Sequence, residues 1–152
     1  MENDLMQNIL NMQKAETITE LKECNSFTVS YGLSLSDTQI MELAGRRFEA
    51  LKNTGRVEFK QGILKKLILE FCDSPFIFQE NYEATISELQ ESFYYFKNES
   101  QDRLSDDELI TLMKKYFDGR CQGSLDYLSG TSLEELCRGT RYGYESDEDS
   151  LF

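Results

Sequence analysis

No arrangement of nucleophile and general base stands out in the chain. It contains no histidine, which removes the usual Ser–His–Asp and Cys–His arrangements and the zinc and iron sites that use imidazole. Carboxylates are frequent, but the runs at 106–108 and 134–135 fall in the first turns of predicted helices, where the helix dipole favours negative charge. We therefore expect a protein that is not an enzyme and that needs no metal or cofactor.

Residues 119–124 bring a thiol, a cation and two glycines together. Arg120 and the backbone amides could hold an anion at the start of the next helix, and Arg120 could lower the pKa of Cys121. A plain turn in which Ser124 caps the next helix is the alternative. Arg120, Cys121 and Ser124 are thus weak candidates for an anion site or a reactive thiol. The other three cysteines are far apart and predict reduced, buried thiols.

Four consecutive aromatic residues, 93–96, stand on one predicted helix. Successive helical residues point about 100° apart, so these rings cover nearly the whole circumference. Phe93 and Phe96 continue an apolar stripe, and Tyr94 and Tyr95 must face elsewhere. Such a helix is either buried on all sides or meets a partner on one of them. Because tyrosine is frequent at interface hot spots, Tyr94 and Tyr95 are candidate partner-binding residues.

The C-terminal end combines several acids with a final apolar pair, Leu151 and Phe152. An acidic segment of this kind can dock as a peptide, with its apolar end in a pocket and its acids on a basic rim. Leu151 and Phe152 are therefore further candidates for a partner interface. The alternative is a solvated, disordered end without a binding role.

The charge balance restricts the kinds of partner. There are 28 acidic and 16 basic residues, and the net charge is −12. This field repels nucleic-acid phosphates and anionic lipid, so we expect neither as a partner, whereas basic protein surfaces and cations remain possible. No apolar run approaches the roughly 18 residues of a membrane span, and the first residues are acidic rather than basic as in a signal peptide. We expect a cytoplasmic protein.

The apolar spacing predicts an all-α, single-domain bundle of about six or seven helices. Capping boxes begin three of them, at Ser36, Ser105 and Thr131. The expected helices span 36–53, 61–72, 80–98, 105–118, 124–128 and 131–137. Residues 1–33 are less regular and indicate two short helices, with residues 27–29 either extending the second helix or forming a strand.

Two further features complete the predicted organisation. Alternation from Arg56 to Lys60 predicts a short extended segment near Val57 and Phe59. The composition changes near Thr140, which divides the chain into a helical domain over 1–139 and an acidic disordered tail over 140–152.

Several blocks of the chain resemble an uncharacterised family of small acidic bacterial proteins, a domain of unknown function from Gram-positive bacteria. The resemblance covers about residues 30–138. It is carried by blocks at 55–59, 71–75, 80–82, 93–99, 104–109 and 117–124. It implies a cytoplasmic protein and brings neither an activity nor functional residues.

These observations leave three hypotheses about function. The first is a non-enzymatic interaction or regulatory protein that acts as an oligomer or as a subunit of a complex. The second is a helical domain that binds a small molecule or effector in an apolar cavity, with polar groups such as Arg47, Arg120 or Arg138 converging on it. The third is an acidic nucleic-acid mimic, which requires carboxylates spaced like phosphates along one face.

Overall fold

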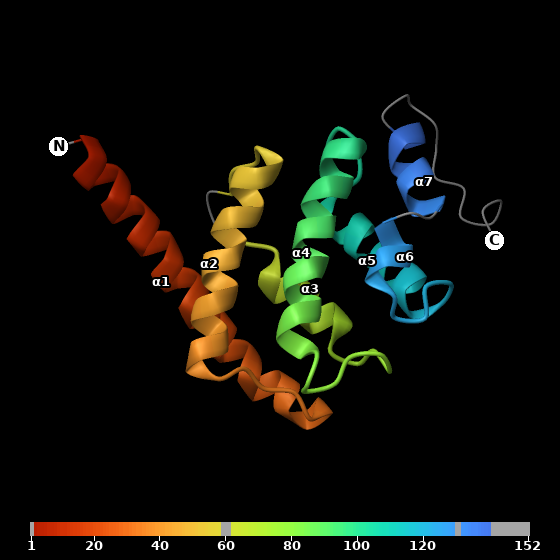
Figure 1. The fold of residues 1–152 in the computed structure, drawn as a ribbon, viewed down its shortest axis with the longest axis horizontal. Helices are drawn as coiled ribbons and strands as arrows, with labels where there is room; N and C mark the ends of the chain where they lie inside the picture. Colours follow the sequence, from red (N-terminus) through yellow and green to blue (C-terminus); the bar gives the residue numbers. More distant parts are fainter. Residues whose placement is uncertain (1, 59–61, 130–131, 141–152) are drawn as a thin grey trace.

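The computed structural model describes residues 2–58, 62–129 and 132–140. Within these ranges the chain forms seven α-helices and one 3₁₀ turn and no strand, which confirms the predicted all-α bundle (Figure 1). The elements are α1 (Glu2–Thr28), η1 (Val29–Tyr31), α2 (Asp37–Thr54), α3 (Leu64–Phe71), α4 (Tyr82–Glu99), α5 (Asp106–Asp118), α6 (Leu125–Ser129) and α7 (Ser132–Thr140).

The first helix corrects the prediction for the N-terminal region. Two short helices and a possible strand were expected, but α1 runs unbroken to Thr28 and continues into η1. No glycine or proline interrupts residues 2–28, so nothing ends the helix earlier. In its C-terminal half, the side chains of Leu21 and Cys24 are buried in the core. In its N-terminal half, which projects from the body (Figure 1), Leu5 and Met12 are exposed.

Helices α2 and α4 lie side by side at the centre of the molecule (Figure 1). The predicted capping box of α2 is confirmed, because the Ser36 side chain accepts from Gln39 N–H while the Gln39 side chain accepts from Ser36 N–H. Gly55 ends the helix in the left-handed conformation, as the sequence indicates. Val57 lies in no regular element and Phe59 falls outside the described residues, so the short extended segment stays a prediction.

The C-terminal third packs α5, α6 and α7 against α4. Ser105 forms its predicted capping box with Glu108, and Ser124 caps α6 by accepting from Tyr127 N–H at 3.2 Å. The third predicted box, at Thr131, lies outside the described residues, as do residues 141–152 with Leu151 and Phe152.

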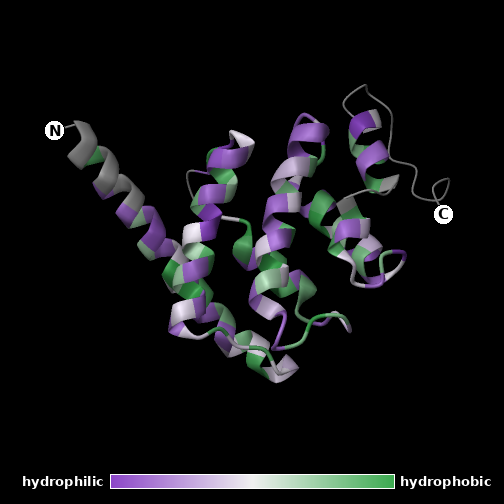
Figure 2. Cartoon of the chain, viewed as in Figure 1, coloured by the Kyte–Doolittle hydropathy of each residue, from purple (hydrophilic) through white to green (hydrophobic). Residues whose placement is uncertain are grey.

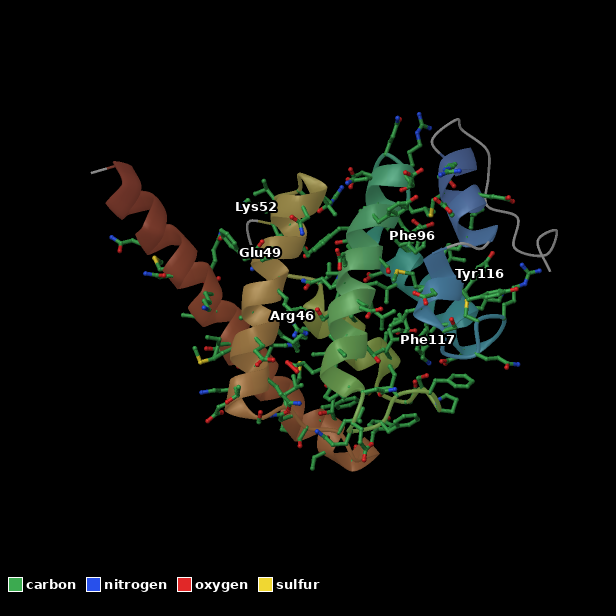
Figure 3. All side chains as sticks on the ribbon, in the orientation of Figure 1. Arg46, Glu49, Lys52, Phe96, Tyr116 and Phe117 are labelled. Carbon is green, nitrogen blue, oxygen red and sulfur yellow. The ribbon has the colours of Figure 1, made fainter. Side chains whose placement is uncertain are left out.

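The core is aromatic and joins most of the helices. Its largest fully buried side chains lie on α3, α4 and α5, and Figure 3 labels three of them on the side of α4 that faces α5 and α6: Phe96, Tyr116 and Phe117. Phe71 and Phe117 meet edge to face with ring centroids 5.5 Å apart, a geometry that aromatic pairs prefer. In the part of the chain that the structure describes, no helix is both long and apolar enough to cross a membrane.

Candidate interaction surface

The aromatic run on α4 is enclosed mainly by the chain itself. Tyr94 is only 1% exposed, and its hydroxyl donates to Glu58 Oε1 at 2.6 Å. Tyr94 therefore lies in the core in this structure and offers no surface to a partner, which corrects its assignment as an interface residue. Tyr95 is half-buried, and its hydroxyl donates to Glu134 on α7. The interpretation of α4 as a central helix fits this packing better than an aromatic face open to a partner.

A polar network connects α1, α2 and α4 in the interior. Arg47 donates from Nε to Glu58 Oε1 at 3.1 Å and from Nη1 to Thr17 Oγ1 at 3.2 Å. Gln90 Nε2 donates to the Tyr94 hydroxyl at 3.1 Å. Burial and the neighbouring Glu58 carboxylate raise the pKa of Tyr94, so the phenol stays protonated as a donor. The network gives partners to most of its buried polar groups, although Gln90 Oε1 has none among the described residues, and it holds the segment after α2 against the bundle.

This network also occupies Arg47, one of the cations expected to face a ligand. The Glu58 carboxylate of the chain is the anion that pairs with Arg47. A Cβ on Gly62 would lie 2.6 Å from Arg47 Nε, so a side chain at position 62 would displace this pair. Arg138 is similarly held, donating to Glu99 Oε2 at 3.0 Å and to Glu134 Oε1 at 2.9 Å. Both guanidinium groups thus have internal carboxylate partners.

The segment 119–124 is a closed turn rather than an anion site. The N–H of Cys121 donates to Tyr116 O at 2.9 Å and that of Gly123 to Phe117 O at 2.8 Å, so these amides point back into the chain. Cys121 is buried, and burial raises the pKa of its thiol despite the opposing charge of Arg120. The prediction of an exposed thiol with a lowered pKa is therefore wrong. The alternative, in which Ser124 caps the next helix, is confirmed.

Two grooves flank the outer face of α4. The first, of about 340 Å³, lies between α4 and α6 and has Tyr95, Phe96 and Leu125 among its apolar lining. The second, of about 290 Å³, lies between α2 and α4, where Ala50 and Ala84 supply apolar surface. Glu88 and Glu91 line both grooves and form the ridge between them. The remaining lining residues are Ser92 and Asp126 in the first groove and Arg46, Glu49, Asn53 and Ser87 in the second.

The ridge carries negative charge that the described part of the chain leaves unneutralised. Within that part, the carboxylates of Glu49, Glu88 and Glu91 form no hydrogen bond or ion pair. Figure 3 labels Glu49 and its neighbour Arg46 on α2. Among the described residues, the ion pair of Arg46 is with Glu42, at 3.9 Å, and its charge also acts on Glu83. Acids elsewhere on the surface are commonly paired, for example Asp102 with Arg56 at 2.6 Å. Glu88 and Glu91 are thus exposed, unpaired carboxylates on α4, as Glu70 on α3 and Glu135 on α7 also are within the described residues; what distinguishes the two on α4 is the groove on either side of them.

A like-charge contact adds to this field. Glu83 of α4 lies against Glu42 of α2, and burial together with the Glu42 carboxyl raises the pKa of Glu83. Sequence reasoning missed these residues, although Glu88 and Glu91 stand three apart on the polar side of the predicted helix, a spacing that places both on one face. What the sequence does not show is that hollows border this face on both sides.

Fold and surface together define an all-helical domain with an aromatic core, a buried polar network around Arg47 and an acidic face with a groove on each side. The chain belongs to DUF6323, a family of unknown function that matches residues 20–146. This confirms the resemblance to a domain of unknown function, whereas the bacterial and Gram-positive source stays a prediction. Comparison with curated proteins and with solved structures found no match.

Proposed function

We propose that this protein is a non-enzymatic interaction protein that binds a basic segment of another protein across the outer face of α4. The observation that carries the proposal is the ridge of Glu88 and Glu91 between two grooves, with no cation of the described chain paired to either carboxylate. An acidic surface steers basic partners toward itself and repels acidic ones, so its charge favours specificity and fast association.

The lining of the first groove suits lysine or arginine side chains. Tyr95 and Leu125 offer apolar surface to the methylene stems of such residues, while the carboxylates on the ridge face their charged ends. The Tyr95 ring can also attract a cation placed over its face. A partner segment that straddles the ridge would bring basic side chains into both grooves. Tyr95 would then contribute its ring face, since its hydroxyl is already bound to Glu134.

A labelled peptide rich in lysine and arginine, with an acidic peptide of equal length for comparison, tests the proposal by fluorescence anisotropy. We expect the basic peptide to bind and the acidic one not to bind. Replacing Glu88 and Glu91 by glutamine should weaken binding at least ~10-fold, about 1.4 kcal/mol or more. The matched control, Glu70→Gln with Glu135→Gln, changes the net charge equally at exposed positions on α3 and α7. Equal weakening by both pairs would show attraction to net charge and no specific face.

The other hypotheses have less support. An effector site built on Arg47 or Arg138 would have to displace the chain's own carboxylates, Glu58 for Arg47 and Glu99 and Glu134 for Arg138. The nucleic-acid mimic stays a prediction, as does the location in the cytoplasm.

A further inference from the structure

We infer that the groove between α4 and α6 is a pocket for an arginine side chain and binds it in preference to lysine. The inference rests on the proposed binding of a basic segment and narrows the partner to a segment with an arginine that enters this groove. The groove has a volume of about 340 Å³, with the outer face of α4 as one wall and Leu125 and Asp126 of α6 as the other. In Figure 2, hydrophilic and hydrophobic bands follow each other along α4, which packs against α6.

The α4 wall of the groove passes from acidic to aromatic within a few turns. Its residues stand at positions 88, 91, 92, 95 and 96, a spacing that places them on one helical face. Glu91 and Tyr95 are four residues apart, so their side chains are neighbours on that face. A planar cation over the Tyr95 ring can therefore reach the Glu91 carboxylate as well. One ligand group thus has both a ring face and a carboxylate available to it.

A guanidinium uses this combination better than an ammonium does. It is planar, so it stacks on an aromatic face while the N–H groups at its edge point toward carboxylates. It is also weakly hydrated, so it loses less on leaving water for a groove to which Phe96 and Leu125 add apolar lining. A lysine ammonium is a compact and strongly hydrated charge, so the same groove offers it less.

The Tyr95 ring is held in place by the chain itself. Its hydroxyl donates to Glu134 of α7, and Glu134 Oε1 also accepts from Arg138 Nη2 at 2.9 Å. Arg138 Nε donates in turn to Glu99 Oε2 on α4, at 3.0 Å. The Tyr95 ring also meets Phe96 edge to face, with centroids 5.6 Å apart. A ring fixed in this way loses little conformational freedom on binding, which favours affinity.

The groove between α2 and α4 lacks these features. Among the described residues that line it, none is aromatic, and Arg46 contributes a positive charge. A guanidinium there would meet that charge and would find no ring to stack on. We therefore expect the arginine in the groove between α4 and α6, and only the general attraction of Glu88 and Glu91 on the other side of the ridge.

Two peptides of equal length and charge, one with arginine and one with lysine at every basic position, test this inference by fluorescence anisotropy on the full chain. We expect the arginine peptide to bind at least ~10-fold more tightly. Tyr95→Leu removes the ring face and should bring the ratio of the two affinities close to one. Equal affinity of the natural chain for both peptides would overturn the inference.

Further variants locate the pocket. Tyr95→Phe keeps the ring and loses the hydrogen bond to Glu134, so it should retain most of the preference for arginine. Tyr127→Leu makes the same change as Tyr95→Leu at a 63% exposed position on α6, outside the groove, and should retain all of it. Circular dichroism establishes that each variant is folded. If Tyr95→Leu is not, Leu125→Ser on the opposite wall replaces it and should also lower the ratio. A preference that survives these changes in the groove, or that Tyr127→Leu removes equally, would contradict the assigned pocket.

The inference and the proposed function fail separately. If both peptides bind equally well and both lose affinity in the variant with Glu88→Gln and Glu91→Gln, the basic-segment function stands and only the arginine pocket is overturned. If neither peptide binds the natural chain, both are overturned.

Discussion

Glu83 is a residue whose charge should reduce the stability of the fold. Burial and the facing Glu42 raise its pKa above the ordinary 4.5, so the folded chain binds this proton more tightly than the unfolded chain. The destabilisation therefore appears as the pH rises from 4.5 through the folded-state pKa. We expect Glu83→Gln to raise the free energy of unfolding by ~0.5 kcal/mol at neutral pH, the size of other like-charge contacts on helices.

Thermal unfolding of this variant at neutral pH and in acid, below the ordinary pKa of Glu83, checks the expectation, because the gain should vanish in acid. Glu70→Gln, which removes an exposed charge from α3, is the control. An equal gain from Glu70→Gln would assign the effect to net charge and not to the contact with Glu42.

Tyr94 matters for its hydroxyl as well as for its ring. Tyr94→Phe removes the donor to Glu58 and the acceptor for Gln90 while keeping the aromatic packing. Because buried polar partners left unpaired cost free energy, we expect a loss of ~1–3 kcal/mol in urea unfolding. Tyr127→Phe, at an exposed position, should change little. If Tyr94→Phe leaves the free energy of unfolding unchanged, the hydroxyl of Tyr94 contributes nothing to stability.

At the scale of elements, the start of α5 depends on a local signal. Ser105 Oγ accepts from Glu108 N–H at 3.1 Å, which satisfies one of the free amides of the first turn. We expect Ser105→Ala to cost ~1 kcal/mol in chemical denaturation and Ser105→Asn to retain most of the stability, since asparagine is also a good N-cap. If both substitutions cost the same, the loss would come from something other than the cap.

The elements that could be predicted from sequence are those with local signals. The capping boxes at Ser36 and Ser105 need only residues three positions apart, and both are present. In α1 the apolar residues shift phase along the sequence, which suggested two helices, yet no residue there breaks a helix. The position of Tyr94 could not be predicted, because its partner Glu58 is 36 residues away. The burial of Cys121 likewise depends on how the turn folds back on α5.

The two grooves beside α4 could not be predicted either, because they depend on helices that are far apart in the sequence. A sequence shows that Glu88 and Glu91 share a face of one helix, but the hollow on each side requires α2 and α6 to be placed. Residues 25–36 and 74–79 are an intermediate case. The sequence shows that neither stretch has a charged residue, whereas their contact in space depends on the hydrogen bonds between Ser34 and Gln79.

At the scale of the whole molecule, stability should reside in the body and not in the projecting start of α1. Leu5 and Met12 are exposed, and Thr17 is a buried residue farther along the helix. We expect deletion of residues 1–12 to change the free energy of unfolding by less than ~1 kcal/mol, since the side chains described in this segment, at 5, 8, 11 and 12, are all exposed. Deletion through Cys24 should be severely destabilising, because it removes Leu21 from the core. A large loss from the shorter deletion would contradict this division.

The burial of all four cysteines gives the molecule an internal reporter of its own opening. Cys24 lies on α1, Cys72 follows α3, Cys121 follows α5 and Cys137 lies on α7, and burial raises the pKa of each, to about 11 for Cys24 and about 12 for Cys137. An alkylating reagent attacks thiolates, so it should modify each site only when that region transiently unfolds. Mass spectrometry of the alkylated chain over time would then rank four separate regions by how often they open, without adding a probe.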